Sequence, residues 1–317
     1  MLPRPLRLLW LALAQRLVKV QCRRVPEPEL MQGLDQVEGY DAAGETTLAV
    51  VYALAVELLN LSGFGRDTWS MLDLGCGTAK FTRRVAEAFH PRRIVAIDGS
   101  HEMLRLAASN LSGLPDTRIE VLLQDITLTE DIPSESFDLV ACSLTAHHLP
   151  GLETVEALLC EMGRIAKSHG VVFLIDLSRL KTRRLMEQYV QVFSPGQSTI
   201  HNLDFLNSMV AAFTPAELRS VIPNKGDDSL WIHFAMPVLP TLQVVLRLPR
   251  TAQPCYRPVW RNSPVNYLRN FEWRLLRTLL LRKCVRTWAE ALAVPRGPDR
   301  AASRLPPANQ EQQLVKS

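Results

Sequence analysis

The sequence has no pair of cysteines in a C-x-x-C spacing, although it contains six cysteines. Scattered single cysteines argue against a zinc site and against a disulfide framework, and they favour reduced thiols in a cytoplasmic protein. We therefore expect no bound metal. The chain also lacks a strong net charge, at +4, so composition alone does not indicate a nucleic-acid partner. With 317 residues, 47% of them hydrophobic, it can bury a large core.

Acidic residues are missing from the first 26 positions, where six arginines and lysines surround a short apolar run, Leu8–Ala14. That run is too short to span a bilayer. It predicts an amphipathic helix that packs on the domain or lies on a membrane surface, with a secretory signal or a transit peptide as alternatives. We expect residues 1–39 to form a basic amphipathic extension and lid, in a protein that is cytoplasmic or peripheral on a membrane.

Short apolar strands alternate with helical segments through the middle of the chain. Strands are expected at 70–74, 93–97, 118–123, 137–143 and 171–176. Helices are expected at 45–61, 79–89, 101–111 and 153–167, with a loop at 40–44. This alternation predicts an α/β fold with a doubly wound sheet. Two later apolar runs, 230–236 and 242–248, can pair as an antiparallel hairpin, which completes a seven-stranded Rossmann-like sheet.

Helices replace strands after the fifth strand. They are expected at 181–193 and 204–213, and Thr214 and Pro215 then open another helix as its N-cap and first residue. We expect a helical insertion over 177–213. The domain that contains it is expected to span 40–250.

The C-terminal part is basic. From Arg247 to Arg286 there are nine arginines and one lysine but a single acid, Glu272. Apolar residues recur at helical spacing there, at Leu268, Phe271, Leu275 and Leu279. These features predict a basic helical appendage at 251–293. The tail at 294–317 is rich in proline, arginine, alanine and glutamine and is expected to be disordered.

Four strand ends carry groups that suit a nucleotide-like ligand, because ligands of doubly wound sheets bind beyond the carboxyl ends of the strands. The turn Asp73–Ala79 contains glycines that let a ligand lie against the main chain at the start of a helix. Asp98, 25 residues after Asp73, is placed to accept the hydroxyls of a ribose. Gln124-Asp125-Ile126 is placed to contact an adenine amine, and the run Ser143–His148 follows the fourth strand.

These segments resemble the class I S-adenosylmethionine-dependent methyltransferases. The resemblance is carried by Leu72-Asp73-Leu74-Gly75-Cys76-Gly77-Thr78, Asp98-Gly99-Ser100-His101-Glu102-Met103-Leu104, Gln124-Asp125 and Phe137-Asp138-Leu139-Val140. Ala146–Leu149 and Met162–Ala166 look like the ubiquinone/menaquinone-biosynthesis branch and related bacterial small-molecule enzymes. Ala79 stands where the family often has a third glycine. A dinucleotide-binding dehydrogenase is the alternative, but Lys80 stands where its fingerprint has glycine.

The resemblance implies S-adenosyl-L-methionine as the cofactor and a small molecule as the substrate, methylated on oxygen or carbon. It implies cofactor contacts at Tyr40, Asp73, Gly75, Cys76, Gly77, Asp98, Gly99, Met103, Asp125, Ile126 and Ser143. The insertion helps to roof the substrate pocket in bacterial natural-product members of that branch. Candidate substrate contacts are therefore Asp176, Arg179, His201 and Asp204.

An oxygen or carbon nucleophile must lose a proton, and histidine suits the role of general base because its ordinary pKa is about 6.5. His147 and His148 follow the fourth strand, where the methyl group is expected, so either is a candidate base. Alternatively, one caps a helix and the other packs inward.

The basic ends leave the substrate and the partners open. They favour a hydrophobic aromatic, quinone-like or natural-product substrate, or else an anionic membrane that supplies a lipid or quinone. RNA is a weaker alternative, because no RNA-binding module is visible. A homodimer is compatible with the sequence. A cofactor-dead interaction protein is disfavoured, since every cofactor position carries a competent residue.

Overall fold

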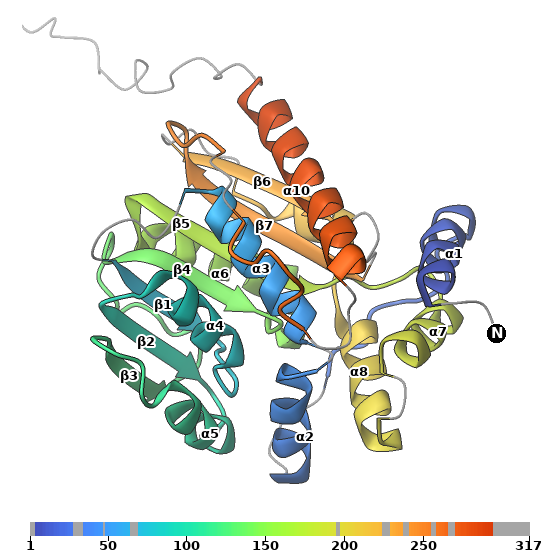
Figure 1. Cartoon of the computed structure of the whole chain (residues 1–317), viewed down its shortest axis with the longest axis horizontal. Coiled ribbons are helices and arrows are strands. Elements are labelled where there is room, and N and C mark those ends of the chain that lie inside the picture. The colour runs from blue at the N-terminus through green and yellow to red at the C-terminus, as the bar shows by residue number, and fades with distance from the viewer. Residues whose placement is uncertain are drawn as a thin grey trace, which may run out of the picture.

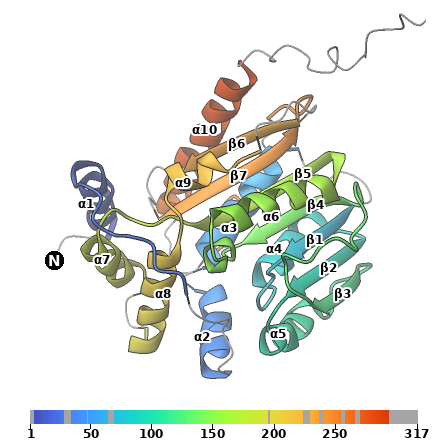
Figure 2. The ribbon, with the colours of Figure 1, turned by 180° about the vertical axis from the view of Figure 1, so that it is seen from behind.

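Seven strands form one mixed sheet in the order β3-β2-β1-β4-β5-β7-β6 (Figure 1, Figure 2). The computed structural model describes residues 4–27, 34–46, 48–63, 69–194, 197–223, 229–236, 241–254, 258–265 and 270–293. The strands are β1 (Ser70–Leu74), β2 (Arg93–Asp98), β3 (Arg118–Leu123), β4 (Phe137–Ser143), β5 (Ala166–Leu177), β6 (Ser229–Ala235) and β7 (Leu242–Pro249). The first five are parallel, and β7 lies antiparallel between β5 and β6. The expected doubly wound α/β sheet, with its terminal hairpin, is confirmed.

Helices cover both faces of this sheet. They are α1 (Arg4–Leu17), α2 (Leu34–Gly44), α3 (Ala49–Leu61), α4 (Lys80–Phe89), α5 (His101–Leu111), the 3₁₀ turn η1 (Ala146–His148), α6 (Leu152–Ile165), α7 (Arg183–Phe193), α8 (Thr199–Ala211), α9 (Pro215–Ser220) and α10 (Asn270–Leu292). Alternate residues of each strand face opposite sides. Met71 of β1 therefore packs in the core with α3, α4 and α10, whereas Leu72 packs in the core with α6 and α9.

The helix α10 lies in the segment that was predicted from the sequence to form a basic appendage. It packs against β6 and α3 (Figure 1). Its Trp273 and Trp288 side chains are almost completely buried. Arg277 Nη1 of α10 lies 3.5 Å from Oε1 of the buried Glu57 in α3. This arginine-rich segment therefore contains a helix that contributes to the hydrophobic core. The tail at 294–317 lies outside the described residues.

The helical insertion after the fifth strand is also confirmed. In it, α7 packs on α8, and α1 from the N-terminus packs on α7 (Figure 1, Figure 2). The helix α9 begins as expected at Thr214, whose hydroxyl accepts a hydrogen bond from the backbone N–H of Glu217 while the Glu217 carboxylate accepts one from the N–H of Thr214. This reciprocal capping fixes where the insertion ends.

Several predicted boundaries were wrong. The helix α8 begins at Thr199, although it was expected to begin at 204. The expected loop at 40–44 is the last part of α2, which begins at Leu34. Strand β5 begins at Ala166, although a helix was expected to continue to Lys167 and a break was expected at His169-Gly170. Lys167 is held in the strand, since its Nζ donates to Oδ2 of Asp138 in β4 at 2.8 Å. Such a contact between distant residues leaves no local sequence signal.

Candidate functional site

A cavity of about 670 Å³ opens beside the ends of β1, β2 and β4. It lies where ligands bind in doubly wound sheets. Nine of the predicted site residues line it: Tyr40, Gly75, Gly77, Asp98, Gly99, Met103, Asp125, Ile126 and His148. The rest of its wall is formed by Ser100, Leu123, Gln124, Thr127, Leu144, Thr145, Leu149, Pro150 and Thr154.

The glycine turn after β1 forms one wall with bare backbone. Gly75 has a φ of +73° and Gly77 a φ of +53°, which is the left-handed region that glycine adopts without strain. A Cβ on Gly75 would lie 2.3 Å from Cγ2 of Thr145, so no side chain fits there. Thr145 is itself fixed, because its hydroxyl donates to the carbonyl oxygen of Gly75 at 2.9 Å. The turn therefore offers main-chain surface to a ligand.

Asp98, at the end of β2, joins this turn to the next helix. The N–H of Gly77 donates to its Oδ2 at 2.8 Å, and the N–H of Ser100 donates to its Oδ1 at 2.9 Å. Burial raises the pKa of Asp98, although these backbone hydrogen bonds oppose the shift. A carboxylate has about four acceptor sites. Asp98 can therefore still accept hydroxyl donors from a ligand in the cavity.

Several buried oxygens around the turn have no hydrogen-bond partner in the described part of the chain. They are Oδ1 of Asp73, Oγ1 of Thr78 and Oγ of Ser143. The other carboxylate oxygen of Asp73 accepts a hydrogen bond from the hydroxyl of Thr82. Burial and, to a smaller extent, the charge of Asp98 raise the pKa of Asp73 to about 7, although the hydrogen bond from Thr82 opposes the shift. Unsatisfied buried polar atoms cost free energy unless a ligand or water reaches them.

The two histidines of η1 have different surroundings. The His147 side chain is 4% exposed, and its Nδ1 lies 2.6 Å from Oδ1 of Asp176. Burial alone would lower the pKa of His147, but the charge and hydrogen bond of Asp176 outweigh it, so the pKa is raised. His148 is 25% exposed and lines the cavity. Only the second histidine of the predicted pair therefore lies at the cavity.

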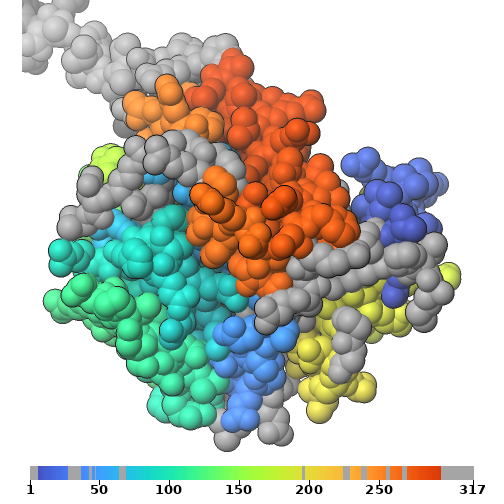
Figure 3. Space-filling view, viewed as in Figure 1, coloured from blue at the N-terminus to red at the C-terminus, as the bar shows by residue number. Residues whose placement is uncertain are grey.

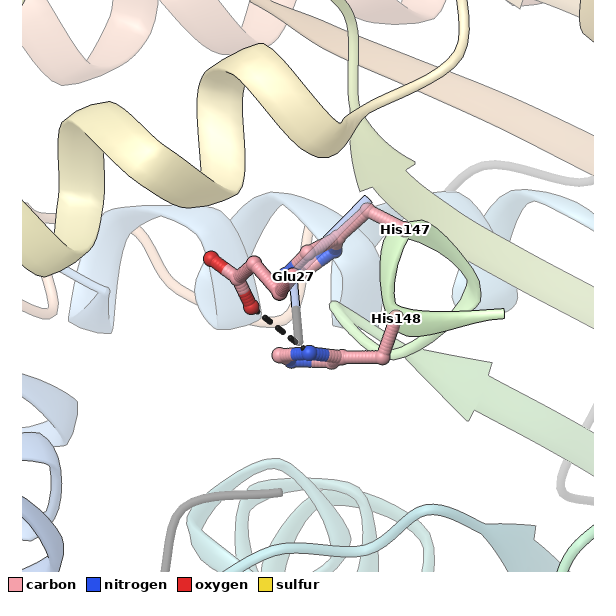
Figure 4. A group of neighbouring side chains, drawn as sticks. All are labelled: Glu27, His147 and His148. Carbon is pink, nitrogen blue, oxygen red and sulfur yellow. Dashed lines mark ion pairs between the residues drawn. The ribbon is translucent and has the colours of Figure 1, made fainter. Parts of the chain in front are cut away.

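Glu27 is the partner of His148, and no pattern in the sequence had indicated this residue. Its Oε2 lies 2.7 Å from Nδ1 of His148 (Figure 4). Its Oε1 accepts a hydrogen bond from the hydroxyl of Ser208 in α8 at 2.8 Å. Burial raises the pKa of Glu27, but the hydrogen bond and charge of His148 lower it more, so the net shift is downward. Glu27 is therefore a carboxylate at neutral pH.

Glu27, His147 and His148 also form a set of three potential metal ligands. One ligand atom of each lies within 4.8 Å of the others, and the rings of the two histidines are 4.2 Å apart (Figure 4). Two histidines and a carboxylate suit a divalent transition metal. The prediction that the chain binds no metal therefore needs an experimental test.

Glu27 ends a segment that we call the N-terminal strap, residues 18–27. The strap is anchored by Arg24, whose guanidinium stacks over the ring of Phe213 at 4.1 Å. The same guanidinium donates hydrogen bonds to the carbonyl oxygens of His147, Leu149, Pro150 and Ala211. One side chain thus joins the strap, the loop that carries both histidines, and the end of α8.

Polar contacts hold α2 against the glycine turn. Asn110 donates to Oδ1 of Asp41 at 2.7 Å and to the carbonyl of Thr78 at 2.8 Å, and Lys80 lies 3.3 Å from Oδ2 of Asp41. Tyr40 of α2 faces Gly77, and burial raises the pKa of its phenol to about 12. The Tyr40 side chain thus stays a neutral hydroxyl.

The predicted substrate residues do not line this cavity. Asp176 bonds His147, and Arg179 donates to the carbonyl of Ala212 and to Glu217. His201 and Asp204 are half-buried on α8; burial lowers the pKa of His201, whereas burial and then the charge of Glu27 raise the pKa of Asp204. Asp73, Cys76, Ser143 and His147 are buried beside the cavity rather than in its wall. The functional roles of all these residues stay predictions.

Comparison with known proteins finds a family match for the middle of the chain. Residues 72–174 match the family described as "Methyltransferase domain". The chain is 31% identical over 111 residues to a demethylmenaquinone methyltransferase of Desulfitobacterium hafniense, a match that covers 35% of this chain and 43% of that protein. It is 32% identical over 129 residues to an uncharacterised methyltransferase-like protein of Schizosaccharomyces pombe, covering 40% and 45%. The chain thus spans less than half the length of these curated relatives.

A solved structure has the same fold. The plantazolicin methyltransferase BamL, in complex with a triazolic desmethylPZN analog and SAH, aligns with a TM-score of 0.53 at 12% identity, over 68% of this chain and 90% of that one. At this identity the likeness is one of fold. Together with the family match, it confirms the resemblance seen in the sequence. Within the described residues, no helix has both the length and the apolar character needed to cross a membrane.

Proposed function

We propose that this chain, whose residues 72–174 form a methyltransferase domain of the class I S-adenosylmethionine-dependent family, methylates an oxygen or carbon atom of a hydrophobic small molecule. The observation that carries the proposal is the placement of His148 in the wall of the cavity, with Glu27 on its Nδ1. A base is thereby available beside the bare glycine turn.

The residues around the cavity fit S-adenosylmethionine. The turn at Gly75 and Gly77 leaves backbone surface for the methionine part, and Asp98 has acceptor sites left for the ribose hydroxyls. The unpartnered Oδ1 of Asp73 suits an ammonium group. When bound, the cofactor supplies a methyl group on a positively charged sulfur, which becomes neutral once the methyl has moved to the nucleophile.

His148 is the proposed general base, and Glu27 is the residue that positions it. A carboxylate can only accept hydrogen bonds, so the neutral tautomer of His148 that suits this position carries its proton on the Nδ1 that faces Glu27 and leaves the lone pair on Nε2. That nitrogen can take the proton of a substrate hydroxyl or activated carbon. His147, bonded to Asp176 and buried, holds the loop in place.

The substrate is proposed to be a hydrophobic quinone-like or natural-product molecule. The segment that follows β4 and carries His148 contributes three apolar side chains to the cavity wall, those of Leu144, Leu149 and Pro150. Two relatives of this chain are demethylmenaquinone methyltransferases, and one structural neighbour is a plantazolicin methyltransferase. These names support an apolar substrate class rather than a particular compound.

The test combines cofactor binding with methyl transfer. Wild-type protein is titrated with S-adenosylmethionine by calorimetry, and it is then incubated with methyl-labelled cofactor and an extract of apolar small molecules. We expect binding, and labelled products by mass spectrometry. His148→Ala should keep cofactor affinity but lose turnover by about 10²-fold or more. Asp98→Ala should weaken cofactor binding by roughly tenfold or more, since it removes charged acceptors.

Two results would contradict the proposal. Wild-type protein that does not bind S-adenosylmethionine would remove the cofactor assignment. A His148→Ala variant with unchanged turnover would remove the base. A chelator provides the control for Glu27: we expect turnover to be unaffected, whereas loss that a divalent metal restores would make Glu27, His147 and His148 metal ligands.

A further inference from the structure

The helix α1 exposes an apolar face to solvent. Its opposite side packs on α7 through the buried Leu11. Five large side chains at helical spacing remain 49% to 76% exposed, and we call them the outer face of α1: Leu6, Leu9, Trp10, Leu13 and Leu17. A surface helix normally turns charged and polar residues outward. A continuous apolar stripe on that side points to a binding surface.

The segment that carries this outer face is basic and contains no acid. The segment from Arg4 to Pro26 carries six arginines and lysines and no aspartate or glutamate. Among them, Arg16, Lys19 and Arg23 are exposed. In addition, Trp10 stands among leucines, and its amphipathic ring favours the interface between apolar and aqueous surroundings. The chemistry of this surface therefore complements an anionic, apolar partner.

The position of α1 leaves the outer face accessible in the described structure. In the space-filling view, α1 projects at one edge of the molecule (Figure 3). The other basic helix, α10, differs in this respect, because it uses Trp273 and Trp288 to pack on β6 and α3. Of the two basic ends, α1 is the better candidate for a surface contact.

We propose that the outer face of α1 docks on an anionic lipid bilayer, with the helix lying in the plane of the interface. Its leucines and Trp10 enter the boundary between headgroups and acyl chains, and Arg16, Lys19 and Arg23 bind the lipid phosphates and carboxylates. A second copy of the chain is a poorer occupant, because two basic, acid-free segments brought face to face repel each other.

This docking adds a location to the proposed function. One consequence rests on that function, namely that an apolar substrate can reach the enzyme from the bilayer. The helix α1 contacts α7, which contacts α8, and α8 in turn contacts η1 beside the cavity. The site is therefore connected to the docked helix through one continuous group of helices. The docking itself requires no catalytic activity.

The experiment is vesicle flotation of the full chain. Vesicles of phosphatidylcholine with phosphatidylserine are compared with vesicles of phosphatidylcholine alone, at low and high salt. Wild-type protein should float with the anionic vesicles at low salt, less at high salt, and little with the neutral ones. The double variant Leu9→Glu/Leu13→Glu should partition at least about tenfold more weakly, because two charges replace apolar contacts.

The matched control is Leu128→Glu, which places a glutamate at a similarly exposed leucine after β3 (57% against 54% for Leu13). It should float like wild type. Circular dichroism establishes that each variant is folded, and calorimetry with S-adenosylmethionine tests the proposed function separately. The docking is refuted if wild type stays unbound to anionic vesicles or the double variant floats equally well. A wild-type dimer that the double variant converts to monomer would instead make the outer face an interface between copies.

Discussion

Asp73 is expected to make the stability of the unliganded protein depend on pH. Burial raises its pKa to about 7, against an ordinary value of about 3.9 in the unfolded chain. A carboxyl whose pKa is higher in the folded state destabilises the fold as it ionises, so the penalty grows from about pH 4 to about pH 7 and is constant above. Asp73→Asn avoids this penalty, and the asparagine side-chain oxygen can still accept the hydrogen bond from the hydroxyl of Thr82.

The stabilisation by Asp73→Asn should be about 2 kcal/mol larger at pH 8 than at pH 5.5, because each pKa unit corresponds to about 1.4 kcal/mol. Urea unfolding at the two pH values, without cofactor, measures the difference. Asp125→Asn is the control, since Asp125 is exposed, and it should shift stability little. An Asp73→Asn variant with equal stabilisation at both pH values would show that Asp73 does not ionise in this range.

Residues on strand ends could be predicted from the sequence, but Glu27 could not. Asp98 follows a continuous apolar strand, and the fold places every such carboxyl end at one edge of the sheet. Glu27 lies in a segment without periodicity, and it reaches His148 across 121 positions of chain, counting from 27 to 148. Only the folded strap brings the two side chains together.

At the scale of elements, the strap is expected to control the loop that carries His148. Arg24 binds carbonyl oxygens of that loop at Leu149 and Pro150, and that of Ala211 at the end of α8. Arg24→Ala should therefore cost on the order of 1–3 kcal/mol of stability, because several carbonyls lose a charged donor. Turnover should also fall, since the base loses its fixed position, while cofactor affinity is kept.

Hydrogen exchange of the loop at 147–150 is the direct measurement, and exchange should be faster in Arg24→Ala. Arg24→Lys should rescue little, because an ammonium cannot reproduce the planar fork. The neighbouring Arg23, which is exposed, provides the control Arg23→Ala. If the hydrogen exchange of the loop and the turnover rate are the same in Arg24→Ala, Arg23→Ala and wild type, the strap is not the element that orders the loop.

Elements with a strong periodicity of apolar residues were predicted with nearly correct bounds. Elements that are held in place by contacts with distant residues were not. The helix α5 was expected at 101–111 and is found there, because Ser100 caps it and its buried residues recur at helical spacing. The helix α2 has few buried side chains among those described, so its sequence resembles a loop. Its place depends on Asp41 and its contacts with Asn110 and Lys80, which sequence patterns do not reveal.

For the whole molecule, the sequence indicated a helix at α10 but not which of its faces packs on the sheet. The apolar stripe visible in the sequence includes Phe271 and Leu275, and both are 55% exposed. The face that packs on the sheet instead carries Trp273, Leu280 and Trp288. Because α10 is apolar on two sides, periodicity could not decide which side meets β6 and α3. Tertiary packing decides it.

We expect this packing to make α10 part of a single cooperative unit with the sheet. Trp288→Ala should destabilise the fold by about 3–5 kcal/mol, the usual cost of deleting a fully buried large aromatic side chain. That is a large share of the stability of a typical domain. Thermal unfolding followed by circular dichroism should shift to lower temperature as one transition. Calorimetry should show no second transition at higher temperature from a sheet that is still folded. Leu275→Ala, on the exposed side of the same helix, should change the midpoint little. An early local transition in Trp288→Ala, followed by a main transition at the wild-type temperature, would instead make α10 a separate appendage.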